Sequence, residues 1–104
     1  MEAMSDKKYL DEVSEIGLSL TRFTKIMNSK LMENIDKGGW KECPISYLMH
    51  RLEQEVIELK ESLLDQDEED VSNEAADVAN FAMMISDNIA RISLSRSKQD
   101  ENDK

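Results

Sequence analysis

Apolar residues recur at steps of three or four along most of this chain, and two interruptions divide the pattern into three segments. This spacing places apolar side chains on one face of an α-helix. We therefore predict helices over residues 9–35, from about residues 44–46 to residue 64, and over residues 69–92. A chain of 104 residues has the usual size of one domain, which we expect to be all-α with three principal helices.

Both interruptions have the composition of turns. Gly38 and Gly39 are adjacent, and glycine loses more conformational entropy in a helix than any other residue, so the first helix should stop there. Trp40 would then be displayed on a turn. Residues 65–70 are an almost unbroken acidic run, and negative charge is favourable ahead of a helix N-terminus. We predict a short acidic connector between the second and third helices.

The predicted helices carry enough apolar residues to need a partner. A lone three-helix unit of this length buries a modest fraction of its surface, so helices with more than one apolar stripe should pack against another chain. We predict a helical bundle completed by homo-oligomerisation into a homodimer or a homotetramer. The domain should cover residues 1–94, and residues 95–104, which include no apolar side chain, are predicted to form a disordered polar tail.

Charge and cysteine content restrict the partners and the compartment. The chain has 13 Lys and Arg residues and 23 Asp and Glu residues, and the resulting charge of −10 repels a nucleic-acid backbone. Cys43 is the one cysteine, so an intramolecular disulfide is excluded and a reducing compartment is expected. The sequence offers neither the apolar region of a signal peptide nor a membrane span. We predict a cytoplasmic protein that binds no nucleic acid and no membrane.

Four acidic residues form two pairs with the same spacing on consecutive predicted helices. Glu55 and Glu58 lie three residues apart on the second helix, and Glu74 and Asp77 repeat that spacing on the third. Residues three apart are neighbours on a helix surface, so the four acids would converge if the two helices packed as an antiparallel hairpin. Oxygen ligands without a suitably spaced His suit Mg²⁺ and disfavour a di-iron centre. The pattern predicts an anionic phosphate ligand bound together with Mg²⁺.

Each candidate residue also has a structural interpretation. In a chain with 23 acidic residues, pairs at this spacing also arise by chance and would form a solvated face. Trp40 could stack on a nucleobase or anchor its turn against the helices. Lys37 and Arg51 could reach phosphates or pair with nearby acids. His50 is interpreted as a surface residue and Cys43 as a structural one.

The segments around the two acidic pairs are LEQEVIEL at residues 52–59 and EAADVANFAMMI at residues 74–85. They resemble the first and second motifs of the MazG-like nucleoside triphosphate pyrophosphohydrolases, an all-α superfamily. KGGW at residues 37–40 is similar to a turn found in small, phage-like members of that group. The resemblance covers residues 37–88. One departure is Gln54, at a position where many relatives carry a second consecutive glutamate.

The resemblance implies hydrolysis of a nucleoside or deoxynucleoside triphosphate between its α and β phosphates, giving a monophosphate and pyrophosphate. It implies Mg²⁺ as the cofactor, with Mn²⁺ as a substitute. It also implies that Glu55 orients or deprotonates the attacking water and that Asn80 contacts the sugar or a phosphate. The implied metal ligands are Glu55, Glu58, Glu74 and Asp77.

Two other functions remain open at this point. A phosphoribosyl-ATP pyrophosphohydrolase shares the general architecture, but the short chain and the Gly-Gly-Trp turn fit that branch less well. A non-catalytic helical interaction or regulatory module could keep the same fold without turnover. If the protein is an enzyme, the candidate substrate-binding residues are Lys37, Trp40, Arg51 and Asn80.

Overall fold

Three long α-helices and one short 3-10 helix make up residues 5–102, the part of the chain that the computed structural model describes. No β-strand occurs among these residues, so the predicted all-α class with three principal helices is confirmed. Within this part, none of the helices contains an apolar stretch of the length that a membrane span requires. The elements are α1 (Asp6–Glu33), η1 (Ile35–Lys37), α2 (Ile45–Asp65) and α3 (Glu68–Asn102).

Local hydrogen bonds set both ends of α1. The Ser5 side chain accepts a hydrogen bond from the backbone N–H of Lys8 at 3.3 Å and so caps the first turn. At the other end, the backbone N–H of Asn34 donates to carbonyl groups of the last turn. Gly38, with a φ of 90°, then takes a conformation that residues with side chains rarely adopt. The predicted stop at the glycine pair is confirmed, with η1 lying between α1 and the turn.

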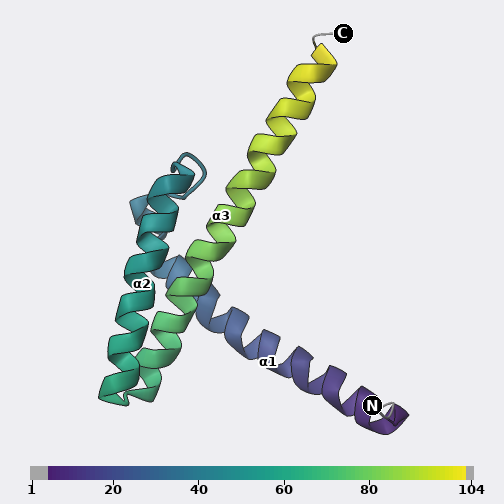
Figure 1. Cartoon of the computed structure of the whole chain (residues 1–104), viewed down its shortest axis with the longest axis vertical. Coiled ribbons are helices and arrows are strands. Elements are labelled where there is room, and N and C mark those ends of the chain that lie inside the picture. Colours follow the sequence, from purple (N-terminus) through teal and green to yellow (C-terminus); the bar gives the residue numbers. More distant parts are fainter. Residues whose placement is uncertain (1–4, 103–104) are drawn as a thin grey trace.

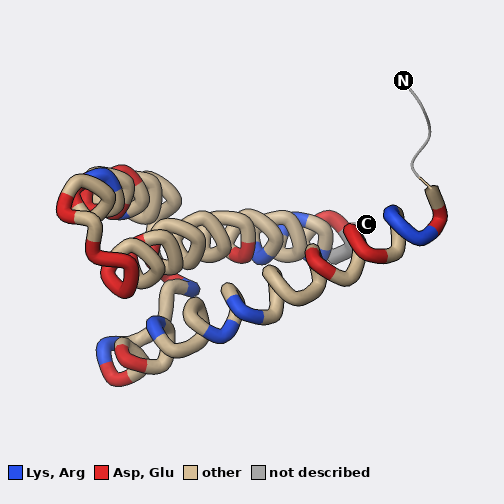
Figure 2. Tube along the Cα trace, turned by 90° about the horizontal axis from the view of Figure 1, so that it is seen from below, with Lys and Arg blue, Asp and Glu red and all other residues tan. Residues whose placement is uncertain are grey.

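α2 and α3 form an antiparallel hairpin, which Figure 1 shows as two helices side by side. Pro44 stands at the N-cap of α2, and Gln66 ends that helix in the left-handed conformation with a φ of 58°. Asp67 then accepts a hydrogen bond from the backbone N–H of Asp70 at 3.1 Å and caps α3. The acidic connector is therefore a tight turn, and its negative charges lie at the N-terminus of α3 (Figure 2).

α1 packs against α3 through its C-terminal third and projects away from the hairpin over the rest of its length (Figure 1). Phe23, Met27 and Leu31 are half-buried in the packed part, whereas residues 5–22 are exposed. The radius of gyration of 18.5 Å is well above the ~13 Å expected for a compact domain of this length. The single chain is therefore open, and it leaves the apolar stripe of α1 uncovered.

Few described side chains are fully buried, and several of these are polar. Leu48 and Ala76 are the buried apolar residues, while the hairpin also buries Glu55, Asn80 and Asn88. Polar groups are usually excluded from such positions unless they are paired or serve a site. The buried polar residues of the hairpin therefore mark a candidate functional site.

α3 continues as a helix to Asn102, well past its predicted end near residue 92. The predicted disordered tail over residues 95–104 differs from the structure over residues 95–102, where the backbone is helical; residues 103–104 lie outside the described part. This segment contains Lys, Arg, Gln and Glu, and it has neither glycine nor proline. An existing helix can propagate through such residues without apolar contacts, because each added residue gains a hydrogen bond.

Candidate functional site

A cluster of three carboxylates lies between α2 and α3. Glu55 and Glu58 on α2 and Glu74 on α3 each bring one oxygen to within 4.8 Å of the others. The antiparallel packing of the hairpin produces this meeting, because acids spaced by three residues share one side of each helix. The structure thus brings together three of the four predicted metal ligands.

Glu55 is the most deeply buried member of the cluster. It is 5 % exposed, whereas Glu58 is exposed and Glu74 is half-buried. Burial raises the pKa of Glu55 to about 8, with further contributions from Glu58 and Glu74, even though Arg51 lies 2.9 Å from one of its oxygens. Burial also raises the pKa of Glu74. The cluster therefore holds protons more tightly than separate carboxylates do, and a cation would relieve the same repulsion.

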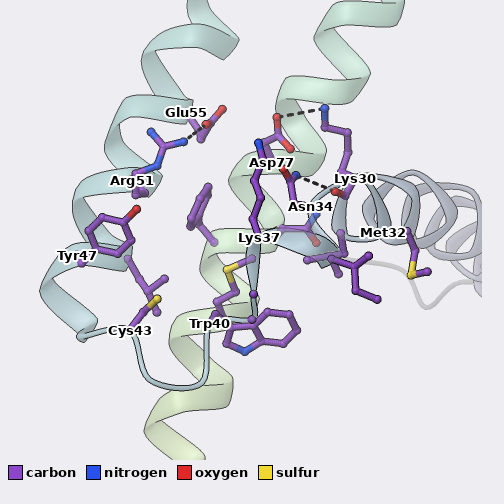
Figure 3. Close-up of a pocket in the computed structure, with 18 of the residues that line it drawn as sticks. Lys30, Met32, Asn34, Lys37, Trp40, Cys43, Tyr47, Arg51, Glu55 and Asp77 are labelled. Carbon is purple, nitrogen blue, oxygen red and sulfur yellow. Dashed lines mark hydrogen bonds and ion pairs between the residues drawn. The ribbon is translucent and has the colours of Figure 1, made fainter.

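Asp77, the fourth predicted ligand, lies outside the three-carboxylate cluster, one turn beyond Glu74 on α3. Its carboxylate is 3.9 Å from Nζ of Lys30, a residue of α1 (Figure 3). Burial raises the pKa of Asp77, and the Lys30 ammonium counteracts that rise. Partial burial works to lower the pKa of Lys30, but the carboxylates of Asp77 and Glu33 raise it above its ordinary value. This ion pair brings α1 to the edge of the site.

Two buried oxygens of the cluster, Oε2 of Glu55 and Oε2 of Glu74, have no hydrogen-bond partner among the described residues. An unpaired buried carboxylate oxygen costs free energy, so such atoms are expected to take up a proton, a water or a cation. A ligand set made only of oxygens suits Mg²⁺ or Mn²⁺. The donor chemistry of the cluster therefore fits a divalent cation held by Glu55, Glu58 and Glu74.

A cavity of about 650 Å³ opens beside the carboxylates. It lies between the C-terminal end of α1, the turn after η1, and the facing sides of α2 and α3 (Figure 3). Glu55 and Asp77 both line it, so the acidic residues form part of its wall. The volume falls within the ~300–1,000 Å³ typical of small-molecule sites.

The two ends of this cavity differ in chemistry. Figure 3 shows Arg51, Glu55, Asp77 and Lys30 gathered at one end, and Trp40 near the other. A charged end that contains both cations and carboxylates suits a phosphate group bound together with a metal ion. An end with an aromatic ring suits a planar or apolar group. The cavity therefore fits an elongated ligand that is charged at one end.

Every predicted substrate-binding residue lines this cavity. Arg51 is already engaged, because it pairs with Glu55 and donates a hydrogen bond to Gln54. Its guanidinium also lies 5.2 Å from the centroid of the Phe81 ring. A guanidinium has five N–H donors, so pairing with an acid leaves donors for a phosphate. The predicted residues on the cavity wall are Lys37, Trp40, Arg51 and Asn80.

Trp40 is anchored to α3. Its indole Nε1 donates a hydrogen bond to Oδ2 of Asp87 at 2.8 Å, and Nε of Arg91 donates to the same oxygen at 3.1 Å. The Trp40 hydrogen bond lowers the pKa of Asp87. Nδ2 of the buried Asn88 donates to the backbone carbonyls of Trp40 and Cys43 at 2.8 and 3.2 Å. These contacts support the anchoring interpretation of Trp40 and fix the turn that forms one side of the cavity.

Sequence reasoning did not identify Lys30, Asp87 or Asn88. The contribution of Lys30 depends on where α1 crosses α3, and no local pattern encodes that crossing. Asn88 carried no local signal, because it lies beside the apolar stripe of the third predicted helix and not on it. A buried amide in such a position needs hydrogen-bond partners, which here are the carbonyls of the turn.

A protein of an archaeon is similar to part of this chain. The chain is 32 % identical over 69 residues to an uncharacterized protein of Archaeoglobus fulgidus, and the match covers 62 % of this chain and 74 % of the archaeal protein. The chain belongs to the same family as this protein. No family model matches the chain, and no solved structure matches it. The name of the archaeal relative states no activity.

Proposed function

We propose that this protein is a Mg²⁺-dependent nucleoside triphosphate pyrophosphohydrolase of the MazG-like group, acting in the cytoplasm. It would cleave ribo- or deoxynucleoside triphosphates to monophosphate and pyrophosphate, with Mn²⁺ as a substitute metal. The observation that carries the proposal is the three-carboxylate cluster at the charged end of a cavity large enough for a nucleotide. The resemblance of both acidic motifs to that group supports the same conclusion.

Cations from three elements favour a triphosphate at the charged end. Lys30 comes from α1, Lys37 from η1 and Arg51 from α2, and all three line the cavity. In a chain with a net charge of −10, these cations offset part of the negative charge of the neighbouring carboxylates and so lower the repulsion that a polyanion meets there. A divalent cation on the carboxylates would neutralise the triphosphate and stabilise the charge that develops on pyrophosphate.

Glu55 is the proposed residue that orients the water and accepts its proton. Arg51 holds Oε1 of Glu55, which leaves the unpaired Oε2 for the metal or for the water. The water oxygen would bond to the α phosphorus as the bond from that phosphorus to the bridging oxygen breaks. The electron pair of the broken bond leaves with pyrophosphate, and the water proton goes to the Glu55 carboxylate.

Turnover tests the proposal directly. Purified protein is incubated with Mg²⁺ and a panel of ribo- and deoxynucleoside triphosphates, and pyrophosphate and monophosphate release are both measured. Glu55→Gln and Glu58→Gln remove cluster carboxylates and are expected to reduce release on the order of 100-fold. Glu53→Gln is the matched control, because Glu53 is an exposed acid on the same helix that lies outside the cluster. It should retain wild-type activity.

Absence of triphosphate cleavage would favour a different class of protein, a helical interaction or regulatory module. If no triphosphate is cleaved with Mg²⁺ or Mn²⁺ by protein whose circular dichroism shows folded helices, the hydrolase proposal fails. The cluster would then be a structural feature of a helical interaction or regulatory module. Equal loss of activity in Glu53→Gln and Glu55→Gln would also count against the cluster, because the effect would not depend on the buried carboxylates.

We further propose that a second copy of the chain covers α1 and makes a homodimer or homotetramer. α1 contains acidic and basic residues in equal number, and Figure 2 shows both signs along it. Two chains that each carry a charge of −10 can therefore meet along this helix with little repulsion. Burial of the exposed apolar residues would stabilise the assembly. Six such residues are 48–65 % exposed: Tyr9, Leu10, Val13, Ile16, Leu18 and Leu20.

The mass of the protein in solution tests this assembly. Light scattering after gel filtration should give twice or four times the mass of the chain, and Val13→Asp combined with Ile16→Asp should give the monomer mass. A wild-type protein that stays monomeric at every concentration measured would show that this face does not bind a second copy.

A further inference from the structure

The amide of Asn80 has one engaged end and one free end. Asn80 is 3 % exposed, and its Nδ2 donates a hydrogen bond to the backbone carbonyl of Met27 at 3.1 Å. Its Oδ1 is buried and has no hydrogen-bond partner among the described residues. The carbonyl of Met27 can only accept, so chemistry fixes the orientation of the amide with nitrogen toward α1. The atom left without a partner is therefore an acceptor.

An unpaired acceptor restricts what can lie next to it. A phosphate oxygen at neutral pH also accepts hydrogen bonds and carries negative charge, so it cannot satisfy Oδ1 of Asn80. A hydroxyl or an N–H group can satisfy it, and pairing a buried polar atom removes the free-energy cost of leaving that atom without a partner. This excludes one of the two contacts, sugar or phosphate, that the family resemblance implies for Asn80.

The position of Asn80 along α3 agrees with this chemistry. Asn80 lies on the cavity wall between Asp77 on the charged side and Met84 further along the helix. At a rise of 1.5 Å per residue, it lies about 4.5 Å beyond Asp77 and about 9 Å beyond Glu74 along the helix axis. A ligand whose phosphates lie at the carboxylates would place its uncharged part beside Asn80.

We propose that Oδ1 of Asn80 accepts a hydrogen bond from a donor on the nucleoside part of the substrate, and so selects nucleotides that carry this donor. The inference rests on the proposed function, because it takes the ligand of the cavity to be a nucleoside triphosphate. In a deoxynucleoside triphosphate the groups with the required chemistry are the 3′-hydroxyl of the sugar and, on the base, an exocyclic amino group or a ring N–H. The phosphates make no contact with Asn80.

The proposal is tested on the wild-type protein by calorimetric titration in the presence of Mg²⁺. The ligands are α,β-methylene nucleotides, which resist cleavage between the α and β phosphates. The sugar arm compares the analogues of the four common deoxynucleoside triphosphates with their 2′,3′-dideoxy counterparts. The base arm compares dATP with dITP and dCTP with dUTP, in which a carbonyl replaces the amino group and the neighbouring ring nitrogen gains an N–H, so that a difference of either sign identifies the donor. Loss of the bonded donor should weaken binding about 10-fold in one arm. The arm that shows the loss identifies the group.

Variants confirm that the discrimination comes from Asn80. In Asn80→Ala the ratio of affinities within the sensitive pair should fall to about one. Ser62→Ala is the control, because Ser62 is a polar residue of the hairpin that is as deeply buried as Asn80 but does not line the large cavity. It should keep the wild-type ratio. Inorganic tripolyphosphate should bind Asn80→Ala and wild type equally, since the phosphates do not touch this residue.

The outcomes separate this inference from the proposed function. Nucleotide binding without discrimination in either arm, or weaker tripolyphosphate binding to Asn80→Ala, overturns the role of Asn80 and leaves the hydrolase untouched. If the protein discriminates between the paired nucleotides but cleaves no triphosphate in the activity assay, the role of Asn80 is supported and the hydrolase proposal fails. If no nucleotide binds, both fail. If Asn80→Ala does not fold, a wild-type protein without discrimination still overturns the inference, and Asn80→Ser replaces the alanine variant where discrimination is found.

Discussion

The hairpin of α2 and α3 buries polar side chains, whereas the projecting part of α1 exposes apolar ones. Both arrangements are the opposite of the usual distribution of side chains in a folded protein. The hairpin places Glu55, Asn80 and Asn88 in its most protected positions. α1 leaves large apolar residues such as Leu10 and Ile16 more than half exposed. Buried polar groups and exposed apolar faces both carry free-energy costs, and each is retained where it serves binding. The contrast fits the ligand site proposed for the hairpin and the interface between chains proposed for α1.

The largest expected difference between the two regions concerns packing. Leu48→Ala removes one of the few fully buried apolar side chains of the hairpin, and it should lower the free energy of unfolding by about 2–5 kcal/mol. Leu94→Ala, at a 63 % exposed position near the end of α3, should change it by less than ~0.5 kcal/mol. Urea denaturation followed by circular dichroism measures both. Equal effects would show that the hairpin has no distinct core.

A smaller loss is expected when the turn is released from α3. Asn88→Ala removes the two hydrogen bonds that hold the carbonyls of Trp40 and Cys43, and it should lower the stability by about 1–3 kcal/mol. Asn34→Ala is the control, because exposed Asn34 makes one local hydrogen bond to the Lys30 carbonyl. Its effect should stay near ~0.5 kcal/mol. A larger loss in Asn34→Ala would place the critical contacts at the end of α1 instead.

The pH dependence of the metal-free protein should come from the hairpin. The folded-state pKa of Glu55 is raised from 4.5 to about 8, so its proton stabilises the fold fully below about pH 4.5 and is lost as the pH rises through about 8. We expect the Tm to fall on the order of 5–10 °C over this window. In Glu55→Gln the fall should be smaller, and Mg²⁺ should stabilise wild type more at pH 8 than at pH 5. Parallel curves for both proteins would contradict the assignment to Glu55.

The smallest expected effect is a gain in α1. Gly17 lies within the helix, and no atom comes within 4 Å of a Cβ added there. Gly17→Ala should therefore raise the stability of the dilute, monomeric chain by about 0.5–1 kcal/mol through helix propensity. Thermal melts over a range of protein concentrations measure it. A gain at low concentration that becomes a loss at high concentration would show that the second copy packs against Gly17.

Local patterns predicted the helices and the meeting of the acidic pairs, but they could not predict how the helices lie against one another. Spacing fixes which face of a helix is apolar, and this was sufficient to bring Glu55 and Glu74 together once α2 and α3 formed a hairpin. The same spacing does not say what covers an apolar face, so the projection of α1 was not foreseen. The pairing of Lys30 with Asp77 depends on that crossing and was missed for the same reason. The absence of apolar residues does not predict disorder over residues 95–102, because an existing helix propagates there without packing.

The anchored turn also gives the protein an intrinsic optical signal. Trp40 is the one tryptophan of the chain, so the indole fluorescence of the whole molecule originates at the wall of the cavity. Its hydrogen bond to Asp87 holds the ring in a single setting against α3. A ligand that enters the cavity changes the polarity around this ring, and the emission spectrum then reports occupancy without an attached label. Stopped-flow measurements of the unmodified protein can therefore separate the binding of the proposed nucleotide from the proposed hydrolysis.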